Sequence, residues 1–124
     1  HSRSRNVLYL SRYHRKWLVE KLHDGSQELD FTAKSLVEDS KNYHAWAHRQ
    51  WVLETFKLWA DEFKYIEELL RADPRNNSAW NQRYFVVTRT TGYTPEACER
   101  EIQFALQFIS QAPNNQSPWN YLKG

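Results

Sequence analysis

The stretch NYHAWAHRQW, from Asn42 to Trp51, concentrates the side chains of this chain that could do chemistry. His44 and His48 are four residues apart, so on a helix both would lie on one face, a spacing that can bind zinc. A zinc site needs at least a third ligand, and the hydrolytic version of this motif also needs a glutamate as general base. The neighbouring sequence supplies neither, so the two histidines do not predict a metal site.

Three of the six tryptophans stand four residues after an asparagine: Trp46, Trp80 and Trp119. An arginine follows three residues after the first two, as Arg49 and Arg83, and Leu122 takes that position after Trp119. A large aromatic side chain that recurs at helical spacing predicts packing, so we interpret these positions as structural. An arginine on an apolar face must be paired. The partner is either an inter-repeat carboxylate such as Asp39 or Asp73, or an anionic ligand. Charge reversal at Arg49 separates the two, because loss of folding indicates pairing and loss of binding alone indicates a ligand.

Composition narrows the possible functions of this chain of 124 residues. The net charge of +2, with no basic face evident from spacing, argues against a nucleic-acid partner. Cys98 is the only cysteine, which excludes a disulfide framework and predicts a reducing compartment, the cytoplasm. No apolar run approaches the ~20 residues of a membrane span. A glycine-rich phosphate loop, a nucleophile elbow and a Cys/His pair are also absent, so the chain alone carries no complete catalytic machinery.

The chain repeats itself with a period of 34 residues. Aligning Trp46 with Trp80 also aligns Asn42 with Asn76, and each asparagine stands where a helix N-cap is expected, as does Asn115. The step from Trp80 to Trp119 is 39 residues, which predicts an insertion around TTGYTPEA. A second helix is predicted in each unit from its apolar spacing: Leu29, Ala33 and Leu36; Trp59, Phe63, Ile66 and Leu70; Cys98, Ile102, Ala105 and Ile109. Thr94 as N-cap with Pro95 after it predicts where the last of these begins.

Helical pairs of this length bury their apolar faces only by stacking on neighbours. We therefore predict an all-α fold, an α-α superhelix: a right-handed solenoid of antiparallel helical hairpins, about three and a half repeats of ~34 residues. A tetratricopeptide array has the same period. The chain has only three glycines and lacks the small residues that such an array requires.

Three segments, KNYHAWAHRQWVLETFKLW, RNNSAWNQRYFVVTRTTGY and SPWNYLKG, resemble the α subunit of protein farnesyltransferase and geranylgeranyltransferase type I. The TTGY insertion and the order of the repeats favour this family over the Rab-specific relative. The resemblance covers residues 13–124, which we interpret as a partial set of α-subunit repeats. Residues 1–12 are a stretch of uncertain origin. We read the chain as a fragment of a longer protein.

The resemblance implies a function that depends on a partner. In this family the α subunit wraps a catalytic β subunit, which holds Zn2+ and transfers farnesyl or geranylgeranyl from the diphosphate to the cysteine of a CaaX-ending protein. Mg2+ is implied for farnesyl transfer. The resemblance places no cofactor, metal or catalytic residue on this chain alone.

The family also implies a diphosphate rim. Asn42, Tyr43 and His44 match a family Asn-Tyr-His near the diphosphate end of the site, where Tyr43 and His44 can donate hydrogen bonds to the leaving group. One repeat earlier the family has Lys-Asn-Tyr-Gln. Here only Tyr9 agrees, while Val7 and Leu10 replace the lysine and the glutamine.

Two hypotheses follow. The first is the α-subunit portion of a CaaX prenyltransferase, enzymatic only with its β subunit. The second is a non-enzymatic helical-repeat scaffold, or degenerate paralogue, that binds protein partners. Val7 and Leu10 favour the second, whereas Tyr43 and His44 favour the first.

Overall fold

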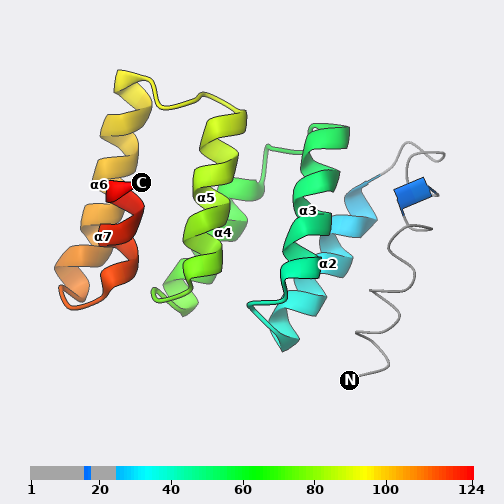
Figure 1. Cartoon of the computed structure of the whole chain (residues 1–124), viewed down its shortest axis with the longest axis horizontal. Helices are drawn as coiled ribbons and strands as arrows, with labels where there is room; N and C mark the ends of the chain where they lie inside the picture. The colour runs from blue at the N-terminus through cyan, green and yellow to red at the C-terminus, as the bar shows by residue number, and fades with distance from the viewer. Residues whose placement is uncertain (1–15, 18–24) are drawn as a thin grey trace. The chain divides into compact units, whose positions relative to one another are not determined.

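The computed structural model describes residues 16, 17 and 25–124, and within this part of the chain it is all-helical (Figure 1). Its helices are α2 (Ser26–Glu38), α3 (Tyr43–Phe56), α4 (Glu62–Ala72), α5 (Asn77–Arg89), α6 (Pro95–Gln111) and α7 (Gln116–Lys123). Successive helices pack in pairs, which we name hairpin 1 (α2 and α3), hairpin 2 (α4 and α5) and hairpin 3 (α6 and α7). The predicted all-α fold of helical hairpins is confirmed. The described residues divide into two compact units, one that contains hairpin 1 and ends at Leu58, and one from Trp59 to Gly124 that contains hairpins 2 and 3.

The second helix of every hairpin begins with the same turn. The three predicted asparagine caps are confirmed: Asn42 accepts from the N–H groups of His44 and Ala45, Asn76 from that of Ala79, and Asn115 from that of Ser117. Each repeated tryptophan closes this turn by donating its indole N–H to a carbonyl six residues earlier: Trp46 to Ser40 at 2.9 Å, Trp80 to Pro74 at 3.0 Å and Trp119 to Pro113 at 3.2 Å. The asparagine and the tryptophan therefore recur because the first satisfies N–H groups that begin the helix and the second satisfies a carbonyl of the turn before it.

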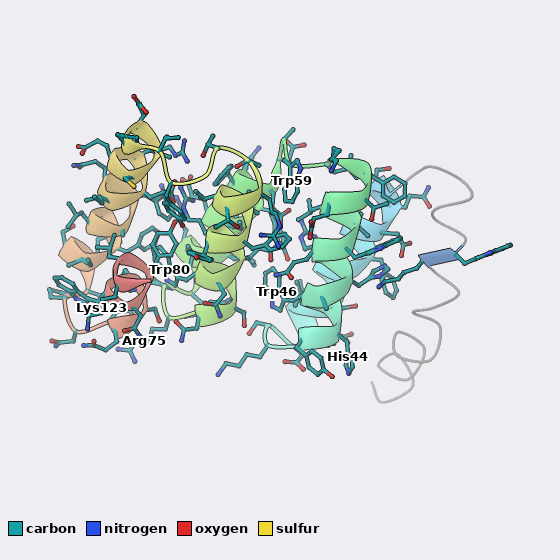
Figure 2. The ribbon with its side chains drawn as sticks, turned by 45° about the horizontal axis from the view of Figure 1, so that its top comes forward. His44, Trp46, Trp59, Arg75, Trp80 and Lys123 are labelled. Carbon is teal, nitrogen blue, oxygen red and sulfur yellow. The ribbon has the colours of Figure 1, made fainter. Side chains whose placement is uncertain are left out.

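The core of the second unit is built around Trp80, which is 2% exposed. Its ring packs edge-on against Phe104 and Phe108, with centroids 5.7 and 5.5 Å away, and is tilted against Tyr121 at 5.2 Å. Figure 2 shows Trp80 among the helices of this unit. The packing interpretation is thus confirmed for Trp80. It is wrong for Trp119, which is 40% exposed and acts through its turn hydrogen bond instead.

The loop between α5 and α6 holds the predicted insertion. Gly92 lies two residues beyond Thr90, the C-cap of α5, and has a φ of 70°, a left-handed conformation that favours glycine; its N–H donates to the carbonyl of Val87 at 2.7 Å. Thr94 then caps α6 by accepting from the N–H of Ala97 at 3.2 Å, and Pro95 is the first helical residue. The predicted start of this helix is confirmed.

The apolar faces that we predicted for the helices now seen as α2 and α6 are partly wrong. On α6, Ala105 and Ile109 are buried as predicted, but Ile102 is 41% exposed, and Phe104, Phe108 and a charged residue, Glu101, complete the buried face. On α2, Glu28 and Thr32 are buried alongside Leu36. The physical reason is the same in both helices: a buried acid has partners on a neighbouring helix, so its face counts as core although its sequence pattern looks polar.

Candidate functional site

The first turn of α3 carries the residues predicted for a diphosphate rim. Asn42 precedes the helix, and its carboxamide oxygen accepts from the N–H groups of His44 at 3.1 Å and Ala45 at 3.2 Å. Tyr43 is the first helical residue and is 70% exposed. The His44 ring lies against the Tyr43 ring, with centroids 4.1 Å apart. Figure 2 labels His44 at the start of α3. Asn42 therefore holds the backbone of the turn, while Tyr43 presents its hydroxyl outward.

This arrangement suits an anion. A helix N-terminus carries partial positive charge. The N–H groups of His44 and Ala45 already donate to Asn42, so the donors that remain for an anion are the Tyr43 hydroxyl and the His44 imidazole. Donors fixed in this way stabilise a group whose negative charge increases during a reaction. They stabilise a group whose charge water already screens to a smaller extent. The turn can thus bind or stabilise a phosphate-like group, and it offers no nucleophile of its own.

Hairpin 1 fixes the rest of α3 against α2. His48 is fully buried, with its Nε2 2.9 Å from Oε1 of Glu28. Arg49 is 4% exposed and donates to the carbonyl of Leu29 at 2.8 Å and to the Thr32 hydroxyl at 3.0 Å. These contacts favour the structural interpretation of Arg49 over an anionic ligand.

His44 and His48 differ in burial. His48 lies in the interior of hairpin 1, whereas His44 is half-buried beside Tyr43. Across residues 16, 17 and 25–124, no three His, Cys, Asp or Glu side chains come together in a way that could hold a metal ion.

Each hairpin contains a buried acid that the sequence reasoning missed. It lies on the first helix and contacts the residue two positions after the tryptophan: Glu28 with His48 at 2.9 Å, Glu62 with Gln82 at 3.0 Å and Glu101 with Tyr121 at 2.7 Å. The signal was present, because the three glutamates are separated by the same 34 and 39 residues as the tryptophans. A glutamate on a helix normally predicts a solvated face, so this repetition did not stand out.

Arg83 forms a buried ion pair with Glu101, which Arg100 and Tyr121 also contact. Arg83 lies in hairpin 2 and Glu101 in hairpin 3, so the prediction of an inter-repeat carboxylate was right about the kind of partner. The predicted partner, Asp73, was wrong, because its side chain accepts from the N–H of Arg75 in the turn before α5, at 3.1 Å. Its counterpart Asp39 likewise accepts from the N–H of Lys41. Short acids before a helix satisfy nearby turn N–H groups and cannot reach the next hairpin.

Burial and neighbouring charges shift the pKa of Glu101 in opposite directions. Burial would raise the pKa of Glu101, but hydrogen bonds from Arg83 and Arg100, the charge of Arg83 and the Tyr121 hydroxyl together lower it below its ordinary value. Burial also raises the pKa of Tyr121, as do its hydrogen bonds to Tyr93 and Glu101. Glu101 therefore stays ionised and Tyr121 stays protonated, which keeps this cluster intact at neutral pH.

Three predicted residues lie outside the described part of the chain: Tyr9, Val7 and Leu10. The role of Tyr9 at the rim therefore stays a prediction. Among the helices that the structure describes, none is long and apolar enough to cross a membrane.

Comparisons with known proteins agree with the repeat pattern. The family model of the protein prenyltransferase alpha subunit repeat matches residues 26–56, 59–90 and 98–124. Over 26 residues, 21% of this chain and 8% of the relative, the sequence is 62% identical to protein farnesyltransferase/geranylgeranyltransferase type-1 subunit alpha of Dictyostelium discoideum. Among solved structures, Candida albicans protein geranylgeranyltransferase-I complexed with GGPP matches with a TM-score of 0.81 and 29% identity. That match covers 96% of this chain and 41% of the Candida chain, so the chain spans less than half the length of that structural relative.

Proposed function

This chain belongs to the protein prenyltransferase alpha subunit repeat family, and from this premise we propose that it is the α-subunit portion of a heterodimeric CaaX protein prenyltransferase. One observation carries the proposal. The three repeat matches coincide with the three helical hairpins, and this arrangement superposes on a protein geranylgeranyltransferase-I with a TM-score of 0.81. The proposed partner is a prenyltransferase β subunit.

In the proposed reaction, the bond between the isoprenoid carbon and the diphosphate oxygen breaks as the cysteine sulfur of a CaaX protein bonds to that carbon. Negative charge grows on the departing diphosphate. The Tyr43 hydroxyl and the His44 imidazole would donate hydrogen bonds to it, while the Asn42 cap holds the turn that carries both. The isoprenoid is farnesyl or geranylgeranyl.

Metal chemistry belongs to the partner in this proposal. A cysteine thiol becomes a good nucleophile when a metal lowers its pKa, and Zn2+ on the β subunit would do this. Mg2+ would assist farnesyl transfer by binding the diphosphate. In this proposal, Tyr43 and His44 contribute binding and orientation of the diphosphate.

The second candidate function is a repeat scaffold that has lost the reaction. Val7 and Leu10 favour it, because neither side chain can contact a diphosphate or a peptide carboxylate as the family's lysine and glutamine do. A scaffold would form the complex with a β subunit but would not support transfer to a CaaX peptide.

Replacing Tyr43 with phenylalanine tests the proposed rim. We expect kcat for prenyl transfer by the complex with a β subunit to fall roughly 10- to 100-fold, the worth of one hydrogen bond to a charged group. The KM for the CaaX peptide should hardly change, because the hydroxyl faces the diphosphate in this proposal. Steady-state transfer to a fluorescent CaaX peptide, after size exclusion of the co-expressed subunits, gives both constants.

Tyr65→Phe is the matched control, since Tyr65 is another partly exposed tyrosine and lies on α4. It should leave kcat unchanged. Equal rates for Tyr43→Phe and wild type would remove Tyr43 from the rim. A wild-type complex without any transfer would instead favour the scaffold.

A further inference from the structure

The turn that leads into the proposed rim, residues 39–42, has the same backbone as the corresponding turn of hairpin 2. The N–H of Asn42 donates to the carbonyl of Asp39 at 3.1 Å, and the N–H of Asn76 donates to the carbonyl of Asp73 at 3.1 Å. Asp39 has φ and ψ of −146° and 95°, and Asp73 has φ and ψ of −146° and 92°. The two turns can therefore be compared position by position.

The turns differ at the next position, where the carbonyl accepts the indole N–H of the repeated tryptophan. Pro74 and Pro113 hold this position in hairpins 2 and 3, whereas Ser40 holds it in hairpin 1. Proline fixes φ near −65° and so limits the conformations that are open to a turn. Serine leaves φ free. The turn before α3 therefore depends more on its hydrogen bonds than the other two turns do.

Two side chains of hairpin 1 hold this turn. Trp46, which is 7% exposed, donates its indole N–H to the carbonyl of Ser40 at 2.9 Å. The Asp39 carboxylate accepts from the N–H of Lys41 at 3.1 Å. Both bonds end on the backbone of the turn, so each of them restrains the segment that leads into α3.

Tyr43 and His44 are the first two residues of α3, directly after this turn. A shift of the turn therefore moves both proposed donors, and a misplacement of about 1 Å can slow a reaction ~100-fold. We propose that Trp46 and Asp39 are positioning residues for prenyl transfer, which fix the turn so that the two donors meet the departing diphosphate. This inference rests on the proposed function, which supplies the reaction, and it adds two residues that touch neither substrate.

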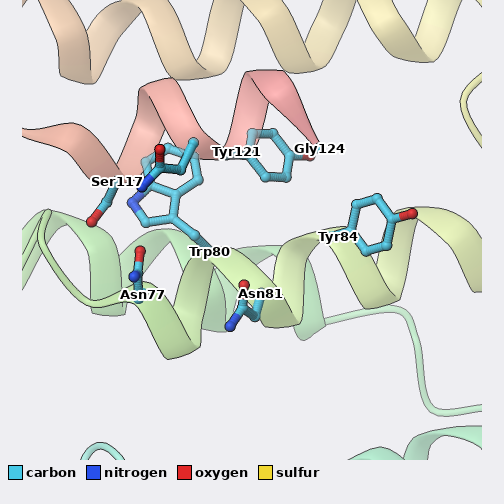
Figure 3. A pocket seen from close by; sticks show the side chains of 8 residues that line it. Asn77, Trp80, Asn81, Tyr84, Ser117, Tyr121 and Gly124 are labelled. Carbon is cyan, nitrogen blue, oxygen red and sulfur yellow. The ribbon is translucent and has the colours of Figure 1, made fainter.

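The first test compares Trp46→Phe with Trp80→Phe, each co-expressed with a β subunit and isolated as the complex. Both changes remove the indole bond of a turn. Trp46→Phe should lower the single-turnover rate constant for transfer to a CaaX peptide at least about fivefold, as the loss of one hydrogen bond predicts, without changing the Kd of the peptide. Trp80→Phe should transfer at the wild-type rate, although Trp80 reaches from α5 towards α7 and packs against Tyr121 (Figure 3).

The second test uses exposed acids, whose removal disturbs the fold little. Asp39 and Asp73 are both exposed, and each accepts from the N–H two residues later. Asp39→Ala should slow transfer about two- to tenfold, whereas Asp73→Ala should not slow it. Asp39→Asn keeps an acceptor oxygen and loses the charge, so it should transfer like wild type. This variant separates the turn bond from a change of charge beside the diphosphate.

Ser40→Pro provides a rescue. It gives hairpin 1 the residue that the other two turns have, and the backbone of Asp39 already has the extended conformation that a residue before proline adopts. In the Trp46→Phe chain, Ser40→Pro should restore most of the lost transfer rate. Thermal unfolding of every complex comes first, and the rates are measured well below the transition, so that only folded proteins are compared.

The outcomes separate the two proposals. If Trp46→Phe and Asp39→Ala transfer at the wild-type rate, or if Trp80→Phe is slowed as much as Trp46→Phe, the positioning inference is overturned while the proposed function stands. A wild-type complex without transfer overturns the proposed function and the inference with it. If Trp46→Phe does not fold, the comparison of Asp39→Ala with Asp39→Asn and Asp73→Ala decides alone.

Discussion

Replacing Glu101 with alanine is expected to lower the free energy of unfolding of this chain by about 3–5 kcal/mol. Glu101 is 2% exposed and is contacted by Arg83, Arg100 and Tyr121. Without its carboxylate, the buried guanidinium of Arg83 would keep its desolvation penalty and lose its ionic partner. Urea unfolding of the variant and wild type, followed by circular dichroism, measures the difference.

Two controls show whether Glu101→Ala destabilises the chain because Arg83 loses its ionic partner or merely because a side chain is removed. Glu99→Ala removes an exposed acid from the same helix and should change the free energy of unfolding by no more than about 0.5 kcal/mol. Replacing Arg83 and Glu101 together with methionine should cost less than Glu101→Ala alone, because no buried charge remains unpaired. The explanation fails if the double replacement is the more damaging change.

The effect of Glu101→Ala should also depend on pH. Interactions in the folded state lower the pKa of Glu101, so its contribution is complete above the unfolded value of about 4.3 and is lost as the pH falls through the folded value. The difference in stability between wild type and variant should therefore be smaller at pH 3 than at pH 7. A difference that grows in acid would contradict the lowered pKa.

Replacing Trp80 with alanine is expected to destabilise the chain by about 3–5 kcal/mol. The side chain is 2% exposed and packs against Phe104, Phe108 and Tyr121, so its removal leaves a cavity that these rings cannot fill. Urea unfolding again gives the free energy.

Trp119→Ala is the matched control, because Trp119 has the same place in the repeat but is 40% exposed. We expect a loss of about 1–2 kcal/mol, mainly from its hydrogen bond to the carbonyl of Pro113. Trp80→Phe, which keeps a ring but loses the bond to Pro74, should fall between the two alanine variants. Equal losses for Trp80→Ala and Trp119→Ala would show that the turn bond, and not the core, explains the repeated tryptophan.

Local features of this chain could be predicted because they depend on residues close in sequence. The caps Asn42, Asn76 and Asn115 each accept from N–H groups two or three residues later. The turn at Gly92 and the helix start at Thr94 follow from backbone conformations that only certain residues favour. The position of Tyr43 and His44 at the start of a helix belongs to the same class, although their proposed role came from resemblance.

The sequence by itself determined the helices, their caps and the repeat, because periodicity and capping act over a few residues. Only the tertiary structure decided that Arg83 pairs with Glu101 and not with Asp73, and that Ile102 is exposed. The physical reason is that the partner of a buried charge depends on which helix faces meet. That choice is set by the packing of whole side chains between hairpins, which a polar or apolar pattern along one helix does not encode.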